Sequence, residues 1–180
     1  MRAAVIYESM YGNSRAVAEA IVEGLQSRCE TELVLAADAD GALLDDLDLL
    51  VVGGPTHTLT MSRPETRDAA LEQAPKMHIE HIESTATAPG VREWFDRTEH
   101  VPPRVAAFCT RTDVPRVFSG SAAKSIAREL RHRGGHLVEA PTSFVVSKGA
   151  PMLLAGELER ARAWGAHLAV SALASRSVPA

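Results

Sequence analysis

The sequence predicts an α/β protein: a three-layer sandwich with helices on both faces of a five-stranded parallel sheet. Short apolar segments alternate along the chain with longer segments of helical periodicity, a pattern typical of parallel sheets. The apolar segments are hydrophobic throughout, as in strands buried on both faces. A chain of 180 residues fits one domain, which we expect over residues 1–174 with a tail at 175–180.

Each element is predicted by a local pattern. The first helix carries Val17, Ile21 and Leu25 on one face, since residues four apart lie on the same side of a helix. The stretch 78–90 has no clear period. The expected strands are Ala3–Tyr7, Thr31–Leu35, Leu49–Gly53, Arg104–Cys109 and His136–Ser147, the last interrupted by Pro141. The expected helices are Asn13–Ser27, Arg63–Gln73, Val91–Arg97, Ser121–Arg133 and Gly156–Leu173, the last with Leu158, Ala161, Gly165, Leu168 and Ala172 facing inward.

Composition excludes several classes of protein. Hydrophobic residues make up 46% and charged residues 23% of the chain, which is ordinary for a globular protein and unlike a disordered one. The net charge of −4 argues against a nucleic-acid partner. Cys29 and Cys109 are the two cysteines and form no CxxC pair, so a metal finger or disulfide scaffold is not expected. No apolar run approaches the roughly 20 residues of a membrane helix, and we expect a cytoplasmic protein.

The loop between the first strand and the first helix, Glu8–Arg15, predicts an anion site. Its backbone N–H groups are expected to meet at a helix N-terminus, where the helix dipole favours negative charge, and Gly12 can adopt a positive φ. The side chains of Ser9, Asn13 and Ser14 can add hydrogen bonds. The P-loop lysine and the G-x-G-x-x-G motif are both absent, so the phosphate of a mononucleotide fits better than a pyrophosphate.

Three segments resemble the flavodoxin family. The pattern Val5-Ile6-Tyr7-x-Ser9-x-x-Gly12-x-Ser14-x-x-x-Ala18-x-x-Ile21 resembles its FMN phosphate-binding signature. Gly53–Thr58 resembles the loop that covers one face of the flavin, and Phe108–Thr112 followed by Ser119–Ala123 resembles the loop on the other side. The resemblance implies strand order 2-1-3-4-5, with FMN at the point where the order reverses.

The resemblance also implies the cofactor-binding residues. They are Ser9, Met10, Tyr11, Gly12, Asn13, Ser14, Pro55, Thr56, His57, Thr58, Cys109, Thr110, Arg111 and Thr112. Neither flavin-facing loop contains the Trp or Tyr that flavodoxins commonly stack on the ring, so we expect His57 to cover one face and Val114 the other. We expect no catalytic side chain. His78 and His81 hint at a metal, but a solvated segment is the favoured interpretation and no metal ligand is assigned.

The favoured function is electron transfer by bound FMN between redox partner proteins, with the chain a monomer or weak dimer. One alternative is an NAD(P)H-dependent FMN reductase or quinone oxidoreductase of the same fold, favoured by the mild acidity and by Arg111 and Arg116 beside the site. A flavin-free interaction domain is the other. A response-regulator receiver is rejected, because the third strand ends in Gly53-Gly54-Pro55 without a phosphoacceptor aspartate.

Overall fold

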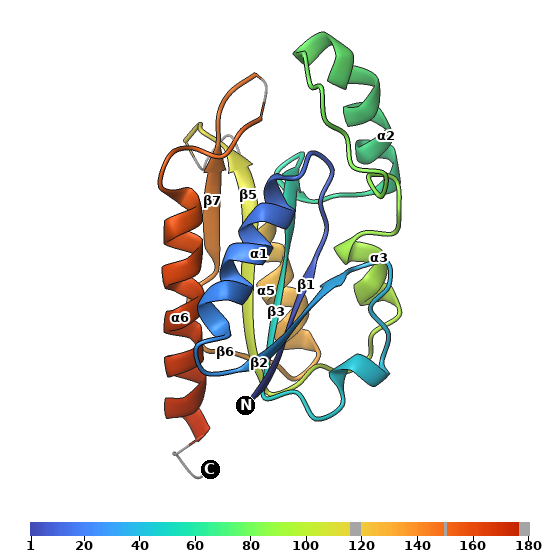
Figure 1. Cartoon of the computed structure of the whole chain (residues 1–180). Helices are drawn as coiled ribbons and strands as arrows, with labels where there is room; N and C mark the ends of the chain where they lie inside the picture. Colours follow the sequence, from blue (N-terminus) through green and yellow to red (C-terminus); the bar gives the residue numbers. More distant parts are fainter. Residues whose placement is uncertain (116–119, 150, 177–180) are drawn as a thin grey trace.

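A computed structural model describes residues 1–115, 120–149 and 151–176 of the chain (Figure 1). The strands are β1 (Arg2–Tyr7), β2 (Glu30–Leu35), β3 (Leu49–His57), β4 (Thr60–Met61), β5 (Arg104–Thr112), β6 (His136–Leu137) and β7 (Thr142–Val146). The helices are α1 (Asn13–Leu25), α2 (Pro64–Gln73), α3 (Val91–Asp96), α5 (Ala122–His132) and α6 (Glu157–Arg176), with short 3-10 helices η1 (Ala42–Leu44) and η2 (Ala74–Met77).

The central sheet confirms the predicted strand order. β2, β1, β3 and β5 lie side by side and parallel, and β6 and β7 both pair with β5 on its far side. The fifth expected strand is therefore divided in two. Pro141 stands just before β7, and proline has no N–H with which to continue the ladder. If the five expected strands are numbered in chain order, with β6 and β7 together as the fifth, the order in the sheet is 2-1-3-4-5.

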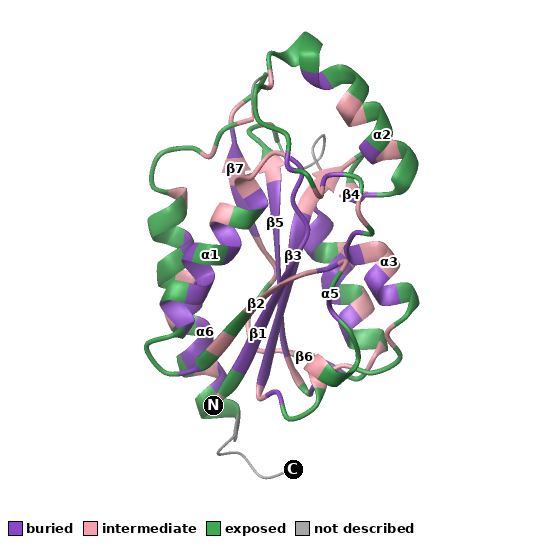
Figure 2. Cartoon of the chain, turned by 45° about the vertical axis from the view of Figure 1, so that its right-hand side comes forward, coloured by how far each residue is buried: buried purple, intermediate pink, exposed green. Residues whose placement is uncertain are grey.

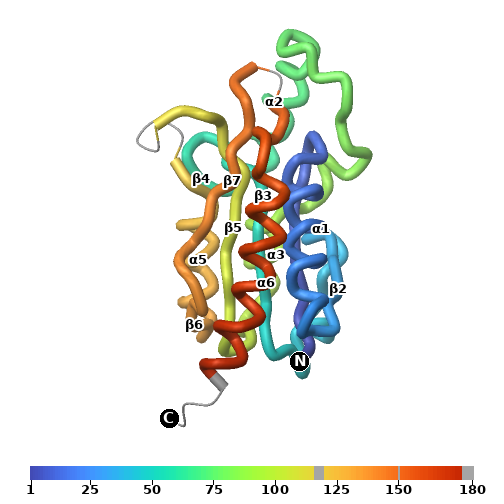
Figure 3. The backbone as a smooth tube through the Cα atoms, turned by 60° about the vertical axis from the view of Figure 1, so that its left-hand side comes forward, coloured from blue at the N-terminus to red at the C-terminus, as the bar shows by residue number. Residues whose placement is uncertain are grey.

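Alternate residues of each strand enter two separate cores. Val5, Val51 and Phe108 pack against α1 and α6, whereas Ile6, Val52 and Ala107 pack against α3 and α5. Because both faces are covered, the middle strands β1, β3 and β5 are buried over most of their length, whereas the edge strand β2 is only partly buried (Figure 2). Figure 3 shows α1 and α6 side by side on one of these faces. The predicted three layers are confirmed.

Two details of the last helix differ from expectation. Ala161, Gly165, Leu168 and Ala172 are buried as expected, but Leu158 is 38% exposed because it lies in the first turn of α6, before the helix reaches the core. The helix also continues to Arg176, past the expected end at residue 173. The rest of the expected tail, residues 177–180, lies outside the described part of the chain.

Helix α2 is placed differently from the other helices. It lies beyond the carboxyl ends of the strands instead of on a face of the sheet (Figure 1), and only Arg67 within it is buried. The β3–β4 hairpin, in which Thr56 pairs with Met61, leads into it. Within the described residues, no helix is both long and apolar enough to cross a membrane.

Candidate functional site

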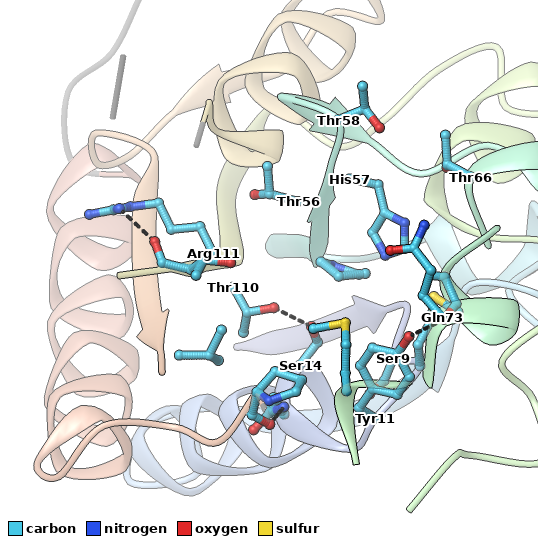
Figure 4. A pocket seen from close by; sticks show the side chains of 18 of the residues that line it. Ser9, Tyr11, Ser14, Thr56, His57, Thr58, Thr66, Gln73, Thr110 and Arg111 are labelled. Atoms are coloured by element: carbon cyan, nitrogen blue, oxygen red, sulfur yellow. Dashed lines mark hydrogen bonds between the residues drawn. The ribbon is translucent and has the colours of Figure 1, made fainter. Parts of the chain in front are cut away.

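A cavity of about 400 Å³ opens where the predicted loops meet at the carboxyl ends of the strands (Figure 4). In open parallel sheets this is where ligands bind, and the volume is typical of a small-molecule site, roughly 300–1,000 Å³. The expected residues that line it are Ser9, Met10, Tyr11, Asn13, Ser14, Pro55, Thr56, His57, Thr58, Thr110, Arg111 and Thr112. The structure therefore brings all three predicted loops to one cavity.

The loop between β1 and α1 has the backbone of an anion cradle. Gly12 has a φ of +85°, and its N–H donates to the Ser9 hydroxyl at 3.1 Å. Among the described residues, no hydrogen bond uses the N–H groups of Met10, Tyr11, Asn13 or Ser14. The first-turn N–H groups of a helix have no acceptor inside the helix. The donors that the sequence predicts for a phosphate are therefore present and uncommitted.

Two side chains of this loop make long-range contacts instead of standing free. The Asn13 amide donates to the Pro151 carbonyl at 2.7 Å and accepts from the Leu153 N–H at 3.2 Å, which holds the loop after β7 against α1. The Ser14 hydroxyl lies 2.8 Å from the Thr110 hydroxyl, a buried contact between the first turn of α1 and β5. The Asn13 side chain thus shapes the rim of the cavity, while its backbone N–H has no partner among the described residues.

The two remaining loops differ in what they present. His57, the last residue of β3, and Thr58, which follows it, both line the cavity. The Arg111 guanidinium donates to the carbonyls of Thr112 (3.1 Å) and Val114 (2.8 Å), and Figure 4 shows it extending away from His57. The guanidinium is therefore folded back on its own loop.

Three expected contacts are not cavity-lining. Gly12 contributes only backbone to the loop, and Val114 does not line the cavity. Cys109 is fully buried in the core beside α5, with its sulfur 3.4 Å from the Ser143 hydroxyl and 3.6 Å from the Ser121 hydroxyl. The Cys109 side chain belongs to the core on the α3 and α5 face, whereas Thr110, the next residue of β5, lines the cavity. Arg116 and Ser119 lie outside the described residues.

A buried polar network joins the end of β1 to α2 and α3. The Glu8 carboxylate accepts hydrogen bonds from the Ser62 hydroxyl and from the Val91 N–H. Arg67 is 3% exposed, donates to the Ser62 hydroxyl at 2.9 Å, and forms an ion pair with Glu93 at 3.2 Å. Buried charges require such partners. Burial raises the pKa of Glu93, but hydrogen bonds from Arg67 and the Gly90 N–H outweigh it and lower the pKa overall.

His57 lies in the cavity wall, and its pKa is lowered. Burial is the main cause, and the nearby Arg67 charge acts in the same direction. The Glu8 carboxylate and a backbone hydrogen bond with Thr66 oppose the shift without reversing it. The imidazole of the folded protein is therefore neutral near pH 7.

This shift predicts how stability depends on pH. In the unfolded chain His57 has a pKa of about 6.5, so below that pH the unfolded state binds a proton that the folded state does not. The free energy of unfolding should fall as the pH drops below about 6.5 and should be insensitive to His57 above it. Urea denaturation between pH 7.5 and 5 would show a smaller fall for His57→Gln than for the wild type. An equal fall in the free energy of unfolding for both proteins would contradict the lowered pKa of His57.

Eight residues line the cavity that the sequence did not indicate, and most of them lie on α2. They are Glu65, Thr66, Ala69, Ala70, Gln73, Met77, Val146 and Pro151. Thr66, Ala70 and Gln73 share one face of the helix, since they follow at intervals of three and four residues. This spacing within Arg63–Gln73 could have indicated a common face of the helix. The residues are too small and polar, however, to mark that face as buried.

The stretch 78–90 packs beside the anion loop and holds no metal centre in the described residues. Its Glu83 N–H donates to the Met10 carbonyl at 2.8 Å, and the Glu83 carboxylate lies 3.6 Å from Arg15. His78 and His81 are exposed. Among the described residues, no group of three or more His, Cys, Asp and Glu side chains is placed to hold a metal ion.

Comparison with known proteins agrees with this arrangement. The family model for Flavodoxin matches residues 5–88. A flavodoxin from the domain Archaea is 19% identical, with a TM-score of 0.64 over 96% of this chain and 99% of that chain. Oxidised Flavodoxin 1 from Bacillus cereus is 15% identical, with a TM-score of 0.62 over 99% of this chain and 100% of that one. No curated protein sequence matches the chain.

The same fold occurs inside a larger protein. The flavodiiron protein from Giardia intestinalis is 23% identical, with a TM-score of 0.61 over 99% of this chain but only 38% of that chain. At these identities the solved structures establish the fold. Together with the family match over 5–88, they confirm the resemblance found in the sequence: this chain is a flavodoxin-like domain.

Proposed function

We propose that the protein binds FMN noncovalently and transfers electrons through it. FMN supplies the redox chemistry, and the protein supplies binding, orientation and exclusion of water. The observation that carries the proposal is the loop Ser9–Ser14, whose uncommitted backbone N–H groups lie at the N-terminus of α1 beside a cavity of about 400 Å³. A phosphate ester with a planar ring fits this combination.

The phosphate would be held mainly by neutral donors. The N–H groups of Met10, Tyr11, Asn13 and Ser14 would bind its oxygens, and the α1 dipole favours its charge. The Ser14 hydroxyl, already paired with Thr110, would link the phosphate loop to the loop after β5. The loop itself contains no lysine, so affinity should depend on backbone geometry.

The ring would lie between the loops Pro55–Thr58 and Cys109–Thr112. The backbone of Thr110 and Arg111 would meet its polar edge, since the Arg111 side chain is turned aside. His57, neutral at pH 7 from its lowered pKa, would lie against the ring without adding charge. No acid or base of this chain is assigned a catalytic role, and the electrons would pass to and from redox partner proteins.

The direct test is an absorption spectrum of the protein purified without added cofactor, followed by chromatography of whatever heat releases. Release of FMN is the expected result. Protein that is colourless and also fails to quench the fluorescence of added FMN would overturn the proposal. That outcome would favour a flavin-free interaction domain of the same fold.

A second function, reduction of a small molecule by NAD(P)H through the same flavin, is favoured by one observation. Helix α2 lies over the cavity, and its Glu65, Thr66 and Gln73 form part of the wall, so one approach to the ring is covered. Anaerobic mixing of FMN-loaded protein with NADH or NADPH separates the two functions. Rapid bleaching by the nicotinamide alone supports a reductase, and bleaching only after addition of a separate reductase supports a carrier.

A further inference from the structure

Helix α2 presents to the cavity a face with small and polar side chains. Thr66, Ala70 and Gln73 lie along this face, with Ala69 beside them and Met77 just beyond the helix. A helix of a globular protein normally buries an apolar stripe against the core. Here the only buried residue is Arg67, at the base of the helix. The face is directed at the cavity, as Figure 4 shows for Thr66 and Gln73 near His57.

The base of α2 is held in place by the buried polar network. Arg67 donates to the Ser62 hydroxyl and to both oxygens of Glu93. Ser62 in turn donates to Glu8 at the end of β1. Since Glu8 and Arg67 are buried, breaking these contacts would leave buried charges without partners. The start of α2 is therefore anchored to the sheet, while its later turns extend over the cavity.

A single hydrogen bond joins those later turns to the anion loop. The Tyr11 hydroxyl donates to the Ala70 carbonyl at 3.0 Å, across 59 positions of sequence. Burial raises the pKa of Tyr11, so the phenol keeps the proton that it donates. Tyr11 belongs to the loop whose N–H groups face the cavity, and Ala70 belongs to the face that lines it.

We propose that α2 is a ring-binding cover that takes the place of the missing aromatic side chains, and that the Tyr11–Ala70 hydrogen bond couples it to the phosphate loop. The inference rests on the proposed binding of FMN. A planar ring can lie against Ala69 and Ala70 because their side chains leave the space open. The Gln73 amide can meet heteroatoms at its edge, whereas the Thr66 hydroxyl is paired with the Arg63 backbone at 2.9 Å and contributes shape to the wall. A ligand that carries both a phosphate and a ring would contact the phosphate loop and α2 at the same time.

Two substitutions and one exchange measurement test the proposal. Ala70→Trp fills the ring space and should weaken FMN binding by about 100-fold or more, corresponding to at least two tenfold losses of about 1.4 kcal/mol each. Tyr11→Phe removes the coupling and should weaken it by roughly 3- to 10-fold, the range of one neutral hydrogen bond. Affinity is measured from quenching of FMN fluorescence. Amides 66–73 of the wild type should exchange more slowly with deuterium when FMN is added.

The matched control is Glu72→Trp, which places the same side chain on an exposed position of α2 that does not line the cavity. It should bind FMN as the wild type does. Equal affinity in Ala70→Trp and Glu72→Trp, with no protection of amides 66–73, would overturn the cover and leave FMN binding standing. A wild type that does not bind FMN would overturn both. If Ala70→Trp fails to fold, the FMN affinity of Tyr11→Phe and the deuterium exchange of amides 66–73 in the wild type test the proposal.

Discussion

Gly12→Val should lose FMN binding while the domain stays folded. Gly12 has a φ of +85°, a conformation that β-branched residues strongly disfavour. A Cβ at this position would have ordinary contacts, 3.6 Å from Glu83 and from His81, so the effect comes from the backbone and not from a clash. The loop should relax to a negative φ, which redirects the N–H groups of Asn13 and Ser14 away from the cavity.

The expected loss of affinity is about 100-fold or more. A hydrogen bond to a charged group contributes about 1.5–3 kcal/mol, so misdirecting two of them removes several kcal/mol of binding. The strain itself costs about 1–3 kcal/mol of stability, which a domain of ordinary stability, about 5–15 kcal/mol, can lose without unfolding. Fluorescence titration with FMN measures the first quantity, and thermal unfolding of the flavin-free protein measures the second.

Two controls separate the backbone effect from the change of side chain. Asparagine tolerates positive φ better than other residues, so Gly12→Asn should keep much more affinity than Gly12→Val. Gly41→Val introduces the same valine where φ is −67° and nothing lies within 4 Å of a Cβ, and it should change neither binding nor folding. Wild-type affinity in Gly12→Val would refute the assignment of the phosphate loop.

The sheet could be predicted because its strands are buried on both faces. Segments such as Leu49–Gly53 are apolar throughout, and burial on both faces leaves little alternative to that composition. The ends of strands were harder to predict. β3 continues to His57 and β5 to Thr112, because pairing with β4 and β7 extends them beyond the apolar core. β4 has only two residues, and β7 follows β5 by about 30 positions, so no pattern within β3 or β5 marks these pairings.

The site could be predicted to the level of its three loops. In a parallel sheet the carboxyl ends of the strands meet at one edge, so the loops after β1, β3 and β5 had to converge. The directions of individual side chains were harder to predict. Cys109 is excluded by the packing of its side chain in the core on the α5 face, and the pairing of Asn13 with Pro151 and Leu153 joins residues about 140 positions apart. Local sequence carries no signal for such a contact.

Helix α2 shows the limit most clearly. Pro64 at its first turn predicted where it begins, since proline suits that position. Its place beyond the sheet depends on Arg67, a residue type that is almost never fully buried unless it is paired. The pairing with Ser62 and Glu93 exists only in the folded chain. The helix could therefore be predicted, but its role as a wall of the cavity could not.

Gly165→Val should destabilise the whole domain, because α1 and α6 touch through their backbones. A Cβ at Gly165 would lie 2.3 Å from the Ile21 carbonyl oxygen of α1. A Cβ at Gly24 of α1 would lie 2.1 Å from the Arg162 carbonyl oxygen of α6. Neither helix can yield by rotating a side chain, since the obstructing atoms are backbone. Valine must push the helices apart, and the packing of Leu168 against the core would loosen.

The expected cost is about 3 kcal/mol or more, at the upper end for overpacked cores. For a domain of this size that corresponds to a fall in melting temperature of roughly 6–12 °C. Ala163→Val is the control, since Ala163 is exposed on α6 and should lose only helix propensity, about 0.5 kcal/mol. Thermal unfolding followed by circular dichroism compares the two. Equal melting temperatures of Gly165→Val and Ala163→Val would show that the two helices are not in backbone contact. Gly24 and Gly165 would then have no role in holding α6 on the sheet.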